Sequence, residues 1–92
     1  AVKYAESKGV LVVAAAGNAK ENIDRIFFTP AAIPTENIIS VGAASSASGA
    51  RSSFTNIGKV NVDLAAPGSD IKSTVPSKGN KSAYDILSGT SM

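Results

Sequence analysis

The sequence predicts an α/β fold. A helical pattern over residues 1–8 leads across Gly9 into the apolar run Val10–Ala16. Such a run, without alternation, is typical of a strand buried on both faces, usually a parallel strand covered by helices. Several shorter strand patterns follow it. A helix that feeds a buried strand, followed by further strands, favours α/β architecture.

The first element is the helix over residues 1–8. It contains good helix formers, and Val2 and Ala5 lie on one face. Gly9 is typical of the position just after a helix C-terminus. Because no capping residue precedes this helix, we expect the segment to begin inside a longer domain.

A turn at Gly17-Asn18 is expected to end the first strand. The stretch 19–34 is expected to be irregular, because residues before proline are pushed out of the helical region. Ile38–Ala43 predicts a second short strand, and the Ser-, Ala- and Gly-rich stretch 44–53 predicts a surface loop.

The segment Val60–Leu64 alternates and predicts a half-buried strand that breaks at Pro67-Gly68. Ile71–Val75 and Tyr84–Leu87 are expected to pair as a hairpin across the polar linker Pro76–Lys81. We find no repeat and no domain boundary. These strands can hardly cover Val10–Ala16 on all sides, so the chain alone should expose sheet edges and apolar surface.

Composition excludes several classes of function. Of the 92 residues, 43% are hydrophobic and 17% are charged, and the net charge is +2. This charge is too weak and scattered to predict a nucleic-acid or membrane-surface partner, and no apolar run approaches the roughly 20 residues of a membrane span. The sequence has no cysteine, which excludes a disulfide framework, a cysteine-ligated metal and a cysteine nucleophile.

The final residues, Ser88–Met92, contain a candidate nucleophile, Ser91. Gly89 stands two positions before it and permits close approach of a substrate backbone. If a helix begins at Ser91, the Ser91 amide is one of the free N–H groups that can face developing negative charge. The alternative is that Ser91 is an ordinary helix cap.

Asn18 is the second candidate. It follows the carboxyl end of a buried strand, where open α/β sheets place their ligands. Its side-chain amide could donate a hydrogen bond to an oxyanion. The alternative is that Gly17-Asn18 is only a turn, for which both residue types are favoured.

The chain resembles the subtilisin-like serine proteases over essentially its whole length. Order and spacing follow the family pattern from the oxyanion-hole strand to the nucleophile. The matching segments are Val12–Asn18, Ile39–Ala43, Ser53–Gly58, Val62–Gly68, Ile71–Thr74 and Ser88–Met92.

The resemblance implies a role for each matching site residue. Ser91 corresponds to the nucleophile that attacks the scissile carbonyl, and Asn18 to the side-chain donor of the oxyanion hole, with the Ser91 amide as the other donor. Ala15, Ala16 and Gly17 correspond to the segment beside the pocket for the substrate side chain before the cut.

The same resemblance includes two positions in the loop 19–34. Phe28-Thr29 falls where the family closes that pocket, although the loop departs from the family in sequence and length. Thr29-Pro30 matches a position that is often a cis peptide in the family.

The implied fold is the subtilisin-like three-layer fold with a mostly parallel central sheet. Residues 1–92 are expected to be a partial catalytic domain, its C-terminal-side portion, truncated at both ends. The family's triad Asp and His lie upstream in chain order. The chain contains no histidine, so we expect the isolated segment to be inactive.

Partners follow from the same resemblance. We expect a peptide or protein substrate and the missing N-terminal part of the same domain. No cofactor or metal is expected in this segment, and calcium is possible in the complete domain. The sequence does not determine the cellular compartment, and the resemblance favours a secreted or extracytosolic protein. The available carboxylates are expected to be surface or turn residues: Asp24, Asp63, Asp70 and Asp85.

Three other interpretations can be compared with this one. A catalytically dead relative that serves as a binding or scaffold module remains the alternative, because the triad Asp and His would lie upstream of residue 1. Sedolisin-type peptidases share Gly-Thr-Ser but place an Asp at the oxyanion position, so Asn18 favours the subtilisin branch. A nucleotide-binding domain lacks support, because no G-x-G-x-x-G or G-K-[ST] loop follows the strand.

Overall fold

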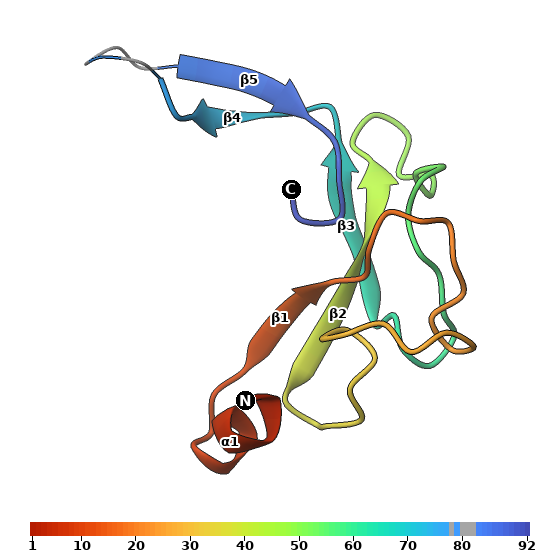
Figure 1. The fold of residues 1–92 in the computed structure, drawn as a ribbon. Coiled ribbons are helices and arrows are strands. Elements are labelled where there is room, and N and C mark those ends of the chain that lie inside the picture. The colour runs from red at the N-terminus through yellow and green to blue at the C-terminus, as the bar shows by residue number, and fades with distance from the viewer. Residues whose placement is uncertain (78, 80–82) are drawn as a thin grey trace.

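The computed structural model describes residues 1–77, 79 and 83–92. It contains one short helix, a three-stranded sheet and a two-stranded sheet among those residues (Figure 1). The elements in chain order are α1 (Val2–Ser7), β1 (Val12–Ala15), β2 (Ile38–Ser45), β3 (Leu64–Ser69), β4 (Ile71–Val75) and β5 (Ala83–Leu87).

The predicted helix is confirmed as α1, one residue shorter at each end. Ala1 occupies the N-cap and makes no side-chain capping bond, as the sequence indicated. Gly9 has φ +69°, a left-handed conformation that glycine adopts without a steric penalty. The Asn37 side chain then donates to the carbonyl groups of Val2 and Val10, which fastens both ends of this region to the start of β2.

Strands β1, β2 and β3 form a sheet in that order, and both pairings are parallel. Val12 aligns with Ile38, and Val41 aligns with Leu64. The prediction of an α/β fold with a mostly parallel sheet is therefore confirmed. The parallel order places the carboxyl ends of all three strands at one edge of the sheet, where the C-terminal segment also lies (Figure 1).

The prediction for the third strand was wrong in its position. The strand does not span Val60–Leu64 and break at Pro67-Gly68; it begins at Leu64 and continues through both residues to Ser69. Among the residues that the structure describes, β3 pairs only with β2, so it is an edge strand of this sheet. Proline is tolerated on an edge strand because the missing N–H leaves no ladder bond unmade on the unpaired side.

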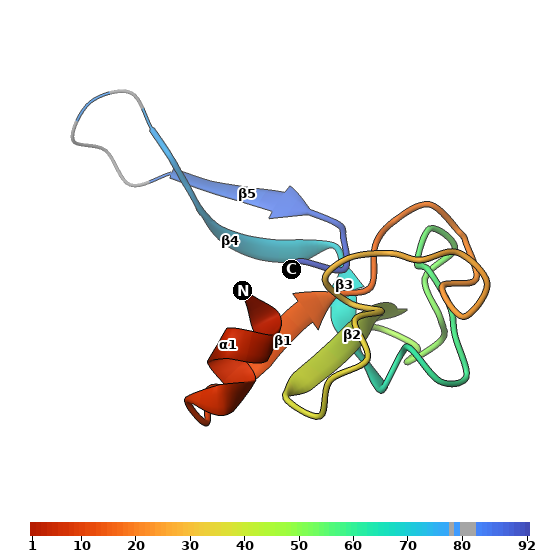
Figure 2. The same ribbon diagram turned by 60° about the horizontal axis from the view of Figure 1, so that its bottom comes forward.

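The first strand is not buried on both faces in this chain. Ala14 is buried, whereas Val13 on the opposite face is 67% exposed. The reason is visible in Figures 1 and 2: the loops after β1 and β2 gather on one side of the sheet, and no described segment forms a covering layer on the other side. The expected exposure of apolar surface is thus confirmed.

The hydrophobic core lies on the loop side of the sheet. Its members are small or aliphatic side chains, which lets the loop 19–34 approach the strands closely. The buried cluster consists of Ala14, Ala16, Ile23 and Ala31, with Phe28, Ile38 and Val62 packed against it.

The predicted hairpin is confirmed. β4 and β5 pair antiparallel, with Ile71 opposite Leu87 and Val75 opposite Ala83. The hairpin projects away from the parallel sheet (Figure 2). Within the predicted linker Pro76–Lys81, residues 78, 80 and 81 lie outside the described residues. Among the described residues, no helix is long and apolar enough to cross a membrane.

One exposed carboxylate holds two loops together. Asp24 accepts hydrogen bonds from the backbone N–H groups of Lys59, at 2.6 Å, and of Asn61, at 2.8 Å. The bond from Asn61 is the main reason why the pKa of Asp24 lies below its ordinary value of 3.8. Ionised Asp24 therefore favours the folded state.

We expect this contribution to depend on pH. Because the folded-state pKa is depressed, the stabilisation is fully present above the unfolded pKa and is lost as the pH falls through the folded pKa. Urea denaturation should show wild type more stable than Asp24→Asn at neutral pH, with the difference shrinking as the pH falls below the ordinary pKa of 3.8. A difference that stays constant or grows in acid would contradict this role.

Candidate active site

The turn Gly17-Asn18 leaves β1 at the carboxyl edge of the sheet. Gly17 has φ +101°, and an added Cβ there would lie 2.7 Å from Cζ of Phe28 and would also collide with Nδ2 of Asn56. Both the backbone conformation and the space therefore require glycine. This explains why Gly precedes the candidate donor, which the sequence indicated only as a turn preference.

The C-terminal segment approaches the same edge through a second glycine. Gly89 N–H donates to the carbonyl of Gly68 at 2.8 Å. A Cβ on Gly68 would lie 2.6 Å from the Gly89 carbonyl oxygen and 2.8 Å from Cβ of Ala43. The absence of a side chain at Gly68 is what allows residues 88–91 to lie against β3.

Thr90 joins the two segments. Its hydroxyl accepts from the N–H of Gly17 at 3.0 Å and donates to Oδ1 of Asn18 at 2.9 Å. Its backbone N–H also donates to Oδ1 of Asn18, at 2.9 Å. A backbone N–H can only donate, so the oxygen of the Asn18 amide must face Thr90 and its Nδ2 group must point elsewhere.

The two predicted oxyanion donors both lie near Gly89. The position that a Cβ on Gly89 would occupy is 3.1 Å from Sδ of Met92, 3.4 Å from Nδ2 of Asn18 and 3.9 Å from the backbone nitrogen of Ser91. Both nitrogens carry hydrogens that can be donated, and Gly89 places no side chain between them. Two donors held near one another can bind developing negative charge on an oxygen.

Ser91 is exposed and lines a cavity of about 610 Å³. The floor of this cavity is the uncovered face of the sheet, including Val13, Ala15 and Val41, and Met92 borders it beside Ser91. Of the three residues predicted beside the substrate pocket, Ala15 lies in this lining. Ala16, which is fully buried, and Gly17 lie outside it.

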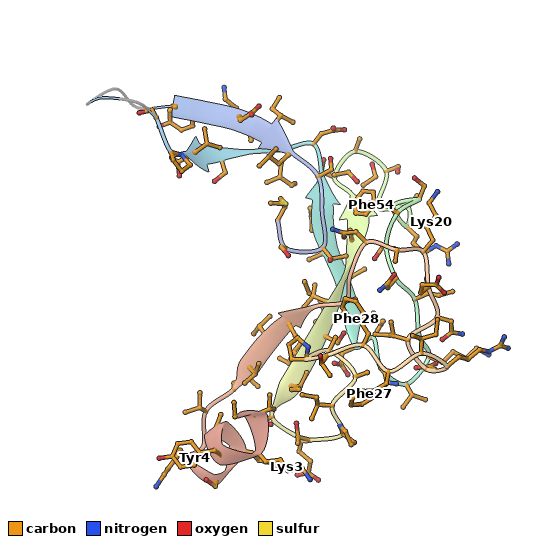
Figure 3. The ribbon with its side chains drawn as sticks, in the orientation of Figure 1. Lys3, Tyr4, Lys20, Phe27, Phe28 and Phe54 are labelled. Atoms are coloured by element: carbon orange, nitrogen blue, oxygen red, sulfur yellow. The ribbon has the colours of Figure 1, made fainter. Side chains whose placement is uncertain are left out.

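The loop 19–34 places Phe28 next to the turn. Phe28, labelled in Figure 3, packs against the buried cluster that contains Ala16. The peptide bond Thr29-Pro30 is cis, which agrees with the prediction for that position. The neighbouring Phe27 is 71% exposed and does not take part in the core.

Two residues important for the geometry were not predicted as site residues. Thr90 was noted only as part of the Ser88–Met92 motif, and Asn56 only as part of the matching segment Ser53–Gly58. Asn56 is fully buried and bonds to the backbone around Gly17. The sequence signal for Asn56 was a polar Thr-Asn pair within the matching segment. The sequence does not show to which turn such an Asn side chain forms its hydrogen bonds.

The Asp24 and Asp63 carboxylates accept hydrogen bonds from backbone N–H groups of other segments. Asp24 binds the loop 59–61, and Asp63 accepts from the N–H of Ser40 at 2.7 Å. All four aspartates are exposed, as predicted for surface or turn residues. In the part of the chain that the structure describes, no three acidic, histidine or cysteine side chains gather into a metal-binding group.

A model of the Subtilase family matches residues 1–92, the whole of this chain. The chain belongs to the subtilase family. The α/β fold with its parallel sheet and the subtilisin-like resemblance of the sequence agree with this assignment.

Similar proteins carry protease names. This subtilase chain is 47% identical to "Alkaline protease 1" of Aspergillus clavatus and 48% identical to "Alkaline protease 1" of Emericella nidulans, each over 92 residues, 100% of this chain and 21% of the relative. It is 49% identical, over 92 residues, to "Thermophilic serine proteinase" of Bacillus sp. strain AK1, covering 100% of this chain and 20% of that protein. The chain thus spans about a fifth of the length of these curated relatives.

The close approach at Gly68 gives a stability prediction. Gly68→Ala should lower the free energy of unfolding by about 1–3 kcal/mol, because the added methyl group meets a backbone oxygen and the Ala43 side chain. Gly68→Val should cost more. Ala65→Val, which adds volume at an exposed position of β3, should change the free energy by less than about 0.5 kcal/mol. Equal effects at the two positions in urea denaturation would contradict the packing argument.

Proposed function

We propose that the protein to which this chain belongs is a serine endopeptidase that hydrolyses peptide bonds through an acyl-enzyme on Ser91. The observation that carries the proposal is that Nδ2 of Asn18 and the backbone nitrogen of Ser91 both lie near Gly89, beside the exposed Ser91 side chain. The protease names of the relatives support the same activity.

The family resemblance assigns a role to each of these residues, and their proximity supports that assignment. The hydroxyl of Ser91 attacks the carbonyl carbon of a peptide or protein substrate, and the carbonyl oxygen becomes negatively charged. Asn18 Nδ2 and the Ser91 N–H donate hydrogen bonds to that oxygen and stabilise the tetrahedral intermediate. We place the segment Ala15, Ala16 and Gly17 beside the pocket for the preceding substrate side chain, with Ala15 as the residue of the three that lines the cavity next to Ser91.

The proton of the Ser91 hydroxyl requires a base. The chain contains no histidine, so we propose that a His and an orienting Asp come from the rest of the catalytic domain. That remaining part of the domain is the partner of this chain, and we propose that it covers the exposed apolar face of the sheet. Family resemblance favours a secreted or extracytosolic protein, and any calcium is expected in the complete domain.

The first test concerns Ser91 and Asn18 in the complete protein. Ser91→Ala should abolish peptide hydrolysis and labelling by a fluorophosphonate, because the attacking oxygen is removed. Asn18→Ala should reduce kcat about 10²–10³-fold with little change in KM, since the donor acts on the transition state. This magnitude is the one known for the loss of such a donor in subtilisin itself. Persistent hydrolysis by Ser91→Ala would reject the proposed nucleophile.

The second test concerns the isolated chain. We expect intact mass measurement to show no fluorophosphonate adduct on the pure 92-residue chain, because no base activates Ser91. The complete protein should be labelled under the same conditions, with Ser91→Ala as the negative control. Labelling of the pure chain that disappears in Ser91→Ala would contradict its inactivity. A complete protein that is folded but not labelled would support the binding or scaffold module instead.

A further inference from the structure

We infer that Asn56 is a positioning residue of the oxyanion hole, which holds the Gly17-Asn18 turn so that Asn18 faces the reacting oxygen. This inference rests on the proposed function. Asn56 does not supply a donor to the reacting oxygen. Its side chain acts on the backbone that carries Asn18.

The Asn56 side chain directs its hydrogen bonds to one turn. Its Nδ2 donates to the carbonyl of Ala16 at 2.8 Å, and its Oδ1 accepts from the N–H groups of Ala19, at 2.9 Å, and Glu21, at 3.0 Å. Its backbone N–H donates to the carbonyl of Gly17 at 2.8 Å. These four bonds surround the turn on both sides of Asn18.

Burial makes these bonds difficult to replace. Asn56 is only 1% exposed and its bond to the Ala16 carbonyl is buried, so solvent has little access to that carbonyl when the side chain is removed. A buried donor or acceptor left without a partner costs about 1–3 kcal/mol, which gives the turn a reason to move. Gly17 has the left-handed φ of +101° within this turn, and the Asn56 bonds hold it there.

Asn56 is itself held rigidly against the sheet. The preceding Thr55 accepts from the N–H of Ala43 at 3.0 Å through its hydroxyl, and Ser52 N–H donates to the carbonyl of Ala43 at 3.0 Å. Ala43 lies in the middle of β2 and is fully buried. The position of Asn56 is therefore set by β2, while Asn18 follows β1.

The turn meets the nucleophile segment directly. Thr90 bonds both Gly17 N–H and Oδ1 of Asn18, and Ser91 is the next residue. A shift of the turn would move Nδ2 of Asn18 relative to the Ser91 amide. Misplacement of a catalytic group by about 1 Å costs on the order of 100-fold in rate.

The experiment is a double-mutant cycle in the complete protein, with kcat expressed per titrated active site. Asn56→Leu should lower kcat by about 10–100-fold with little change in KM, because the defect appears in the transition state. In an Asn18→Ala background, Asn56→Leu should lower kcat further by less than about 3-fold, since no donor remains to misplace.

Asn61→Leu is the matched control. Asn61 is also an asparagine whose Nδ2 donates to a backbone carbonyl of the same loop, that of Ile23 at 3.0 Å, away from the turn. Its kcat per titrated site should stay within about 3-fold of wild type. An equal loss of kcat in Asn61→Leu would identify a general structural effect and overturn the inference.

A second variant keeps the inference testable if Asn56→Leu does not fold. Asn56→Ala removes the same three side-chain bonds without placing an apolar group against the turn, so it should also lower kcat, and this loss should also vanish in the Asn18→Ala background. An unchanged kcat in the folded Asn56 variant, or an equal loss in both backgrounds, would overturn the inference. Loss of the proposed function itself would appear separately, as hydrolysis that survives Ser91→Ala.

Discussion

The contact between the Gly17-Asn18 turn and residues 88–91 is the constraint on which the site depends. It requires glycine at positions 17 and 68, because at each a side chain would collide with a neighbouring segment. Thr90 then fixes the orientation of the Asn18 amide through its oxygen. The side chains of Asn18 and Ser91 are exposed, but the backbone segments that carry them are held by the neighbouring strands β1 and β3.

The two faces of the parallel sheet have different functions. The loop side contains the small-residue core and the buried polar groups that fasten the loops, including Asn56 and Thr55. The opposite side exposes apolar residues such as Val13 and Leu64 and forms the floor of the cavity beside Ser91. An apolar sheet face of this kind gains stability only when another layer removes it from water.

Much of this arrangement was predictable. The apolar run Val10–Ala16 identified a strand, the periodic patterns identified β2 and the β4–β5 hairpin, and the motif around Ser91 identified the candidate nucleophile. The position of β3 was not predictable, because Pro67-Gly68 normally ends a strand and only the edge position of β3 permits both residues. The prediction that β1 is buried on both faces was also wrong. An apolar sequence shows that a strand is stable when covered on both faces, but it does not show which segments cover it.

The sequence by itself determined the family, the order of the strands along the chain and the chemical identity of Ser91 and Asn18, because these depend on residue type and spacing. Only the tertiary structure decided which way the Asn18 amide faces, that the Asn56 side chain bonds to the turn, and that Asn18 Nδ2 and the Ser91 nitrogen both lie near Gly89. Those features depend on contacts between residues about 40 or 70 positions apart. Local propensities carry no information about such contacts, because the hydrogen bonds form only after the sheet has brought the distant segments together.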